Sequence, residues 1–195
     1  MIEEIILHRT QNIFSRQNLS SSFNRGYEMG YKSFEIDLYD ADGLEIQVQH
    51  PNHSEKKKEF STLSNVVNWA SDKEVRIYLD IKYPLMWKRP FKYWLETFAK
   101  LDQNKFFILS FDIEIIKPII QKVGLSFAYM NFKNFPNVDN DFYVIPYNLY
   151  ENTYNVSAEK IIISDVSHGE QINRVLSLGV KRIMINSPYL IKHFT

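Results

Sequence analysis

Short apolar runs and helically spaced apolar residues alternate along most of the chain. Residues 5–9 have the pattern of a β-strand, and residues 18–29 have helical spacing that ends before Gly30, a residue that often terminates helices. The same succession returns as a strand at 75–82 and a helix at 91–101. Repeated βα units of this kind predict a mainly parallel sheet with helices packed on it.

The rest of the chain brings the number of predicted strand positions in the sheet to eight. Asp42-Gly43 separates two alternating runs, and a DG pair in that position predicts a β-hairpin. Counted as one place, this hairpin leaves eight strands, the number that a closed parallel barrel needs. We therefore predict a (β/α)8 TIM-type barrel. The other strands are expected at 33–39, 44–50, 105–111, 125–130, 142–147, 161–163 and 182–185, and the other helices at 63–71, 113–123 and 169–178.

The length of the chain limits this barrel. With 195 residues it is shorter than the roughly 250 typical of the fold, so some helices must be shortened or missing. Residues 131–141 have loop composition, and no helix is predicted there. No Pro-, Gly- or Ser-rich linker divides residues 1–195, which are expected to form one domain. A doubly wound open sheet would explain the alternation, but no Gly-rich phosphate loop follows the first strand.

Composition narrows the classes of partner. Lys and Arg together total 23, as do Asp and Glu, so no basic excess favours nucleic acid or an anionic membrane. The absence of Cys excludes disulfides and thiolate metal sites. The N-terminus lacks the pattern of a signal peptide, and no apolar run reaches the roughly 18 residues that span a bilayer. The expected location is the cytoplasm, and the sequence leaves the oligomeric state open.

Carboxylates lie on one face of two predicted strands. Glu35 and Asp37 are two residues apart, so they project together, about 6.6 Å from each other along the strand. A divalent cation would relieve their repulsion, although an exposed strand face with ordinary acids is the alternative. Asp80 and Lys82 lie on the polar face of the strand at 75–82, near the end where barrel enzymes keep their active sites. A solvated antiparallel strand would show the same alternation.

Histidines and an arginine stand at the ends of other predicted strands. His8 and Arg9 end the first strand, and His50 ends the second strand of the hairpin. A lone His is more often structural than catalytic. Two His with three carboxylates and two cations at equivalent heights would supply acid–base partners, a metal site and a phosphate clamp.

The order of these residues resembles the glycerophosphodiester phosphodiesterase family. The family order HR, EN, F, G, ExD, DG, H is followed by His8-Arg9, Gln17-Asn18, Phe23, Gly30, Glu35-Ile36-Asp37, Asp42-Gly43 and His50. Further on, the family's LEIK strand, SF strand end and closing GVDGIxTDxP segment are similar to Leu79-Asp80-Ile81-Lys82, Ser110-Phe111 and residues 179–188. The resemblance covers most of the chain and is densest over the first 50 residues.

The resemblance implies a barrel enzyme that hydrolyses a small phosphodiester to an alcohol and a phosphomonoester. It also implies a divalent metal ion, Mg²⁺, Mn²⁺ or Ca²⁺. Carried over by position, the general acid and base are His8 and His50, the phosphate contacts are Arg9 and Lys82, and the metal ligands are Glu35, Asp37 and Asp80.

Four departures from the family pattern concern the substrate more than the chemistry. Gln17 replaces the usual Glu, Pro51 the usual Asp, and Asp80 the usual Glu, while residues 163–166 stand where a WTVN segment is frequent. The sequence therefore leaves the alcohol of the substrate open. Two other functions also stay open: a phosphodiester lyase that releases a cyclic phosphate, and a reduced barrel that binds a phosphorylated ligand without turnover.

Overall fold

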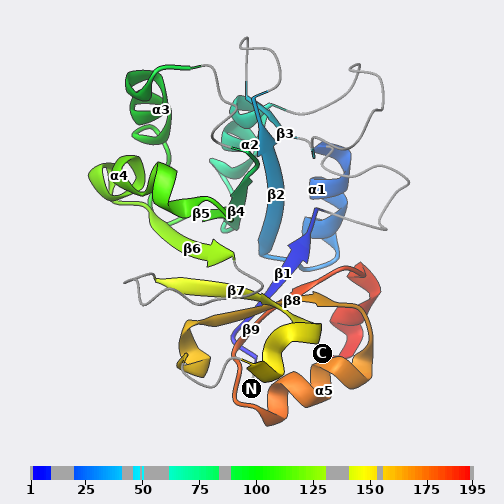
Figure 1. The fold of residues 1–195 in the computed structure, drawn as a ribbon. Coiled ribbons are helices and arrows are strands. Elements are labelled where there is room, and N and C mark those ends of the chain that lie inside the picture. The colour runs from blue at the N-terminus through cyan, green and yellow to red at the C-terminus, as the bar shows by residue number, and fades with distance from the viewer. Residues whose placement is uncertain are drawn as a thin grey trace.

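A computed structural model of the chain describes residues 2–9, 20–40, 46–48, 50, 62–83, 89–130, 141–152 and 156–193. Their strands form a closed barrel (Figure 1). Pairing of β1 with both β9 and β2 closes the ring, which confirms the predicted TIM-type barrel. Its eight parallel strands are β1 (Glu4–His8), β2 (Ser33–Tyr39), β4 (Arg76–Ile81), β5 (Phe106–Ser110), β6 (Ser126–Met130), β7 (Phe142–Pro146), β8 (Ile161–Val166) and β9 (Arg182–Ile185).

A ninth strand, β3 (Gln47–Val48), lies antiparallel to the end of β2. It pairs with Leu38 and Tyr39, whereas β1 pairs with the first half of β2 and β4 occupies the other edge. The hairpin thus takes one place in the ring, in agreement with the prediction. β3 is shorter than the predicted run at 44–50, and the Asp42-Gly43 turn lies outside the described residues.

The helical shell is incomplete. Between β7 and β8 the described residues hold only two 3₁₀ helices, η2 (Tyr147–Asn152) and η3 (Ala158–Lys160), which agrees with the shortening predicted from chain length. A further 3₁₀ helix, η4 (Pro188–His193), follows β9. Residues 131–140, where no helix is predicted, lie outside the described residues. The α-helices are α1 (Ser20–Glu28), α2 (Leu63–Ala70), α3 (Phe91–Phe98), α4 (Ile113–Val123) and α5 (Gly169–Ser177).

Strand alternation divides the core into an outer and an inner cluster. On β4, Ile77, Leu79 and Ile81 join the outer cluster, as their apolar face predicts. The inner cluster fills the barrel with residues from every barrel strand except β2: Ile6, Tyr78, Leu109, Ala128, Met130, Val144, Ile162 and Met184. The inner positions of β2 are polar instead, and on the other strands inward polar residues such as Glu4 of β1 and Asp80 of β4 lie toward the two ends of the barrel.

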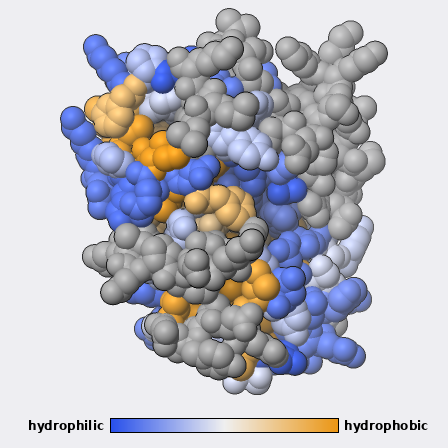
Figure 2. All heavy atoms as spheres, viewed as in Figure 1, coloured by the Kyte–Doolittle hydropathy of each residue, from blue (hydrophilic) through white to orange (hydrophobic). Residues whose placement is uncertain are grey.

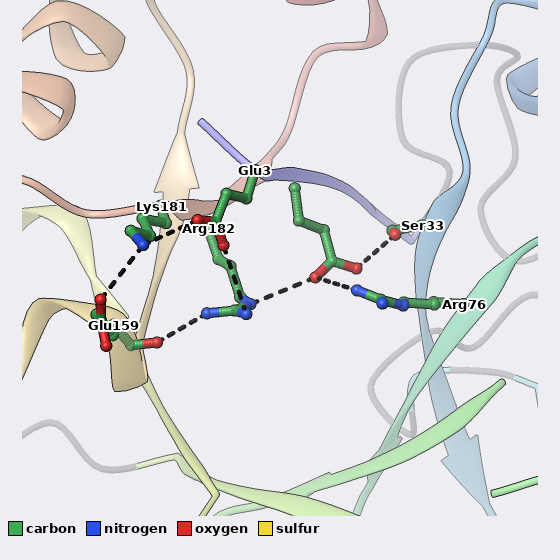
Figure 3. Close-up of polar contacts among 7 residues, drawn as sticks. Glu3, Ser33, Arg76, Glu159, Lys181 and Arg182 are labelled. Atoms are coloured by element: carbon green, nitrogen blue, oxygen red, sulfur yellow. Dashed lines mark hydrogen bonds and ion pairs between the residues drawn. The ribbon is translucent and has the colours of Figure 1, made fainter. Parts of the chain in front are cut away.

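Charged side chains lie at the N-terminal end of the barrel (Figure 3). The buried Glu4 carboxylate accepts a hydrogen bond from the Ser33 hydroxyl at 2.6 Å and one from Arg76 at 3.2 Å. Arg182 Nε lies 3.5 Å from the same carboxylate, and Arg182 Nη1 donates to the backbone oxygen of Glu159 at 2.7 Å. Each of these groups has a partner of complementary charge or polarity, as suits the end of such barrels that serves stability.

The outer surface combines hydrophilic residues with small apolar areas. Where Figure 2 is coloured, hydrophilic residues surround apolar side chains, which reach the surface over α3 and α4 and also lower on the same face. Phe91 and Ile115 are the exposed large apolar residues of these two helices. Single exposed apolar residues are common and need no special explanation. No helix in the described part of the chain is long and apolar enough to cross a membrane.

Candidate active site

Three buried carboxylates meet in the half of the barrel toward the C-terminal strand ends. Glu35 and Asp37 project inward from β2, and the register of β2 and β4 sets Asp80 beside Asp37. Their exposed fractions are 1 %, 0 % and 1 %. One ligand atom of each lies within 4.8 Å of those of the other two. The structure thus brings together the three metal ligands that the sequence predicted, here called the carboxylate trio.

Two cations contact the carboxylate trio. Lys82 Nζ lies 2.9 Å from Asp37 Oδ1 and also contacts Asp80 Oδ2. Arg9 Nε lies 2.9 Å from Asp37 Oδ2, while the Arg9 backbone N–H donates to Glu35 Oε2 at 3.0 Å. Both predicted phosphate contacts therefore lie at the trio. In this structure their charges offset part of its negative charge.

The backbone is unusual at this end of the barrel. Among the described residues other than glycine, positive φ angles occur at Arg9 (50°), Tyr83 (48°) and Asp165 (60°). These residues lie at or just beyond the C-terminal ends of β1, β4 and β8. Left-handed backbone at a residue with a Cβ costs on the order of 1–3 kcal/mol and is concentrated at functional sites. The strain therefore gathers where the predicted site lies.

His8 lies between the carboxylate trio and the end of β9. Its Nε2 lies 3.6 Å from Glu35 Oε2, and its Nδ1 lies 2.6 Å from Asn186 Oδ1. The parallel pairing of β1 and β2 sets His8 directly beside Glu35. Asn186 was not predicted as a site residue. The available signal was its position immediately after β9, the strand that pairs with β1.

His50 follows β3 and is partly buried. Since β3 runs antiparallel to β2 from the level of Tyr39 past Leu38, the chain at His50 heads back toward the level of the carboxylate trio. A catalytic pairing of His50 with His8 stays a prediction. The family departures at Gln17 and Pro51 lie outside the described residues.

Burial sets the protonation of the carboxylate trio. It raises the pKa of Glu35 well above its usual range, and the charges of Asp37 and Asp80 add to the rise. Burial also raises the pKa of Asp80 to about 6, against the pull of Lys82. For Asp37 burial acts in the same direction, but Lys82 and Arg9 outweigh it and lower the pKa. The charges of Arg9 and Lys82 thus do not fully offset the free-energy cost of burying the carboxylate trio.

The basic groups respond to the same surroundings. Burial lowers the pKa of His8 to about 4, and the charge of Arg9 acts in the same direction. His8 is therefore neutral near pH 7 and able to accept a proton. Burial acts to lower the pKa of Lys82, but Asp80 and Asp37 outweigh it and raise the pKa, so the ammonium keeps its charge.

The carboxylate trio has the chemistry of a divalent cation site. Asp80 Oδ1 is buried and has no hydrogen-bond partner among the described residues. Several carboxylate oxygens close together are the ligands that Mg²⁺ and Ca²⁺ prefer, and a cation among them would favour the ionised carboxylates. The residues present therefore fit the metal ion that the family resemblance implies.

Solved structures with the same fold were found by structural comparison. A glycerophosphodiester phosphodiesterase from Parabacteroides distasonis has a TM-score of 0.75 and 16 % identity, with 98 % of each chain covered. One from Agrobacterium tumefaciens has a TM-score of 0.72 and 13 % identity over 97 % of this chain and 98 % of that chain. An Oleispira antarctica phosphodiesterase in complex with its product sn-glycerol-3-phosphate has a TM-score of 0.76 and 12 % identity over 99 % and 97 %.

Comparison of sequences found no match to this chain, whereas comparison of structures did. Neither the protein-family models nor the curated proteins contain a match to this chain. Identities of 12–16 % in the structural matches establish a common fold and no more. The chain thus has the fold of the glycerophosphodiester phosphodiesterases over nearly its whole length, as the order of its motifs predicted.

Proposed function

We propose that this protein is a metal-dependent phosphodiesterase that hydrolyses a small glycerophosphodiester-like substrate to an alcohol and a phosphomonoester. The observation that carries this proposal is the buried carboxylate trio with Arg9, Lys82 and His8 around it. Such a group of charges is costly inside a barrel, since unmatched buried charge opposes folding. A divalent ion would pair with the carboxylates and a substrate phosphate with the two cations, so the charges that oppose folding would favour binding.

The two cations suit a phosphoryl group. Arg9 presents a guanidinium, whose fork of N–H groups matches phosphate oxygens, and Lys82 presents a charged ammonium. Both are already oriented by Asp37, so they need little reorganisation on binding. Preorganised donors of this kind commonly contribute about 3–4 kcal/mol each to a transition state that gains charge.

The carboxylate trio would hold the divalent ion. When bound, the ion supplies positive charge that polarises a phosphoryl oxygen. Glu35, Asp37 and Asp80 are the residues that would ligate it, each through a carboxylate oxygen. Asp37 has a second task, since its two oxygens also orient Arg9 and Lys82.

The two histidines would move protons. The neutral imidazole of His8 accepts a proton near the carboxylate trio, and His50 is assigned as its partner on the basis of the family order. The phosphomonoester product is proposed by analogy with the Oleispira antarctica phosphodiesterase, whose structure contains sn-glycerol-3-phosphate. Which alcohol leaves is open, because the residues at 163–166 differ from the usual segment.

The test is a substrate screen followed by ³¹P NMR. Metal-stripped protein would be incubated with glycerophosphodiesters, nucleotide-linked diesters and lysophospholipids, with and without Mg²⁺, Mn²⁺ or Ca²⁺. We expect a phosphomonoester signal that needs a divalent ion and disappears with Asp37→Asn. Accumulation of a cyclic phosphate would identify a lyase instead. Binding of the diester without turnover under every condition would identify a phosphate-binding barrel and contradict the proposal.

A further inference from the structure

A series of hydrogen bonds leads from His8 away from the carboxylate trio. His8 Nδ1 lies 2.6 Å from Asn186 Oδ1, and Asn186 Nδ2 lies 3.4 Å from Ser167 Oγ. Ser167 Oγ lies 3.4 Å from the backbone carbonyl oxygen of Asp165. The series therefore crosses the C-terminal ends of three neighbouring strands, β1, β9 and β8.

The far end of the series fixes its direction. A backbone carbonyl can only accept, so the Ser167 hydroxyl must donate to Asp165. The Ser167 oxygen is then available to accept from the amide NH₂ of Asn186. The amide oxygen consequently faces His8, and because it too can only accept, His8 Nδ1 must carry a proton.

The groups in this series are held in place from both sides. The Asn186 backbone N–H donates to the carbonyl of Val166 at 3.0 Å. The Ser167 backbone N–H donates to Gln171 Oε1, on α5, at 2.7 Å. The backbone of both residues is therefore fixed, and the amide is oriented by its own contacts with His8 and Ser167. On the other side of the ring, His8 Nε2 faces the carboxylate trio, with Glu35 Oε2 at 3.6 Å.

We propose that Asn186 is a positioning residue whose amide oxygen holds the Nδ1–H of His8 and turns Nε2 toward the carboxylate trio. In the proposed function His8 then accepts a proton through Nε2, and His50 donates one. These reaction roles rest on the proposed function, whereas the orientation of the ring rests on the hydrogen bond between His8 and Asn186.

In the proposed reaction, water replaces the alcohol on phosphorus. The oxygen of the attacking water forms a new bond to phosphorus, and its proton passes to His8 Nε2. The bond from phosphorus to the alcohol oxygen breaks, and that oxygen takes a proton from His50. One diester and one water become one phosphomonoester and one alcohol. Exchange with solvent returns both histidines to their starting states.

NMR of the ring nitrogens tests the tautomer without any substrate. In protein labelled with ¹⁵N-histidine, long-range ¹H–¹⁵N correlations distinguish a protonated from an unprotonated ring nitrogen, and His8→Asn identifies the signals of His8. We expect a protonated Nδ1, in EDTA and in Mg²⁺ alike. In Asn186→Leu, signals from the tautomer with the proton on Nε2 should appear. An unprotonated Nδ1 in the wild type would overturn the proposal.

Kinetics separate positioning from a merely structural role. Asn186→Leu should lower kcat by about 10-fold to 10²-fold, less than loss of the base itself, with little change in KM. Asn186→Asp keeps an acceptor for Nδ1–H and should restore the tautomer and much of kcat. If Asn186→Leu does not fold, Ser167→Ala replaces it, since that change frees the amide to turn over and should yield mixed tautomers.

Two results would contradict the proposal: an unchanged kcat in folded Asn186→Leu, and a single unchanged tautomer in that variant. Failure of the proposed function is distinguishable from both. If the wild type hydrolyses no diester, the proposed function is wrong, and the NMR spectrum still decides whether Asn186 sets the His8 tautomer.

Discussion

At the N-terminal end of the barrel one buried carboxylate, that of Glu4, meets the Ser33 hydroxyl and two guanidinium groups. Toward the C-terminal end, three buried carboxylates share Arg9 and Lys82, and Asp80 Oδ1 has no hydrogen-bond partner among the described residues. Among these described residues, donors exceed acids at the first end, and acids exceed cations at the second. Both ends draw on β1, β2 and β4 or on the residues directly after them.

The difference shows what each end does for the molecule. A fully partnered buried acid costs little and ties neighbouring strands together. A buried acid without a matching positive charge has a raised pKa and makes the folded protein less stable. Such a cost is typical of sites where a ligand supplies the missing charge. The four predictions below test this contrast, from the largest expected effect to the smallest.

Replacing His8 should have the largest effect on activity. We expect His8→Asn to lower kcat by about 10²–10⁴-fold because it removes a general acid–base group, and His50→Asn to act similarly. Steady-state hydrolysis of the diester found in the screen measures this, with circular dichroism as the check on folding. His168, which precedes α5, provides the matched control, and His168→Asn should keep its activity. Turnover above a tenth of wild type in folded His8→Asn would remove it from the mechanism.

Glu4→Gln should affect stability and leave chemistry alone. The change leaves two guanidinium groups without the shared carboxylate, and since Arg76 is about half exposed, we expect a loss of about 1–3 kcal/mol in the free energy of unfolding. Urea denaturation measures it. Activity per folded molecule should match the wild type. A lower kcat in folded Glu4→Gln would mean that the two ends are not separate in function.

Asp80→Asn should stabilise the metal-free protein, and increasingly so as the pH rises. An acid whose pKa is raised on folding binds its proton more tightly in the folded state, so wild-type stability falls as pH rises through the interval between its unfolded pKa and about 6. The advantage of Asp80→Asn should therefore grow over this interval, by about 3 kcal/mol at most. Urea denaturation in EDTA at several pH values measures it.

The comparison with Asp80→Asn is needed because His8 gives the opposite slope. Its pKa is lowered to about 4 in the folded state, so its contribution to stability rises with pH up to its ordinary pKa. Subtracting the variant from the wild type cancels this contribution to first order. A stability difference that stays flat with pH would show that folding does not raise the pKa of Asp80.

The choice of ion should show the smallest effect. Asp80 is one methylene shorter than the usual Glu, which withdraws its oxygens by about 1.3–1.5 Å, more than a ligand bond can stretch. A bridging water would fill such a gap, and Mg²⁺ keeps its waters more readily than Ca²⁺ does. We expect Mg²⁺ or Mn²⁺ to support activity at least as well as Ca²⁺, and Asp80→Glu to remain active. Metal titrations of both proteins would decide it, and a strict requirement for Ca²⁺ would refute the water bridge.

Strand alternation and helical spacing were enough to predict the fold from the sequence, together with most residues around the carboxylate trio. The strand at 33–39 and the helix at 113–123 match to the residue, because alternation and helical spacing are unbroken there and Gly124 ends the helix. Alternation also placed Glu35 and Asp37 on one face. The hairpin strand was predicted too long, since Ile46 and His50, which the structure describes, lie outside β3.

What sequence reasoning missed depends on contacts between distant residues. The bond from His8 to Asn186 joins positions 178 apart, and no local pattern marks an Asn after a strand as its partner. The double contact of Lys82 with Asp37 and Asp80 likewise follows from the register of β2 and β4, which periodicity alone does not fix. The roles of the site residues therefore remain proposals for experiment.

One measurement tests the central claim most directly: diester hydrolysis by metal-stripped protein as Mg²⁺ is added, compared among wild type, Glu4→Gln and Asp37→Asn. If the C-terminal half of the barrel lacks the positive charge that an ion supplies, wild type and Glu4→Gln should start near zero and rise along the same one-site saturation curve. Asp37→Asn should stay near zero at every concentration. Full activity of the wild type in EDTA, or a normal Mg²⁺ response in Asp37→Asn, would contradict the account.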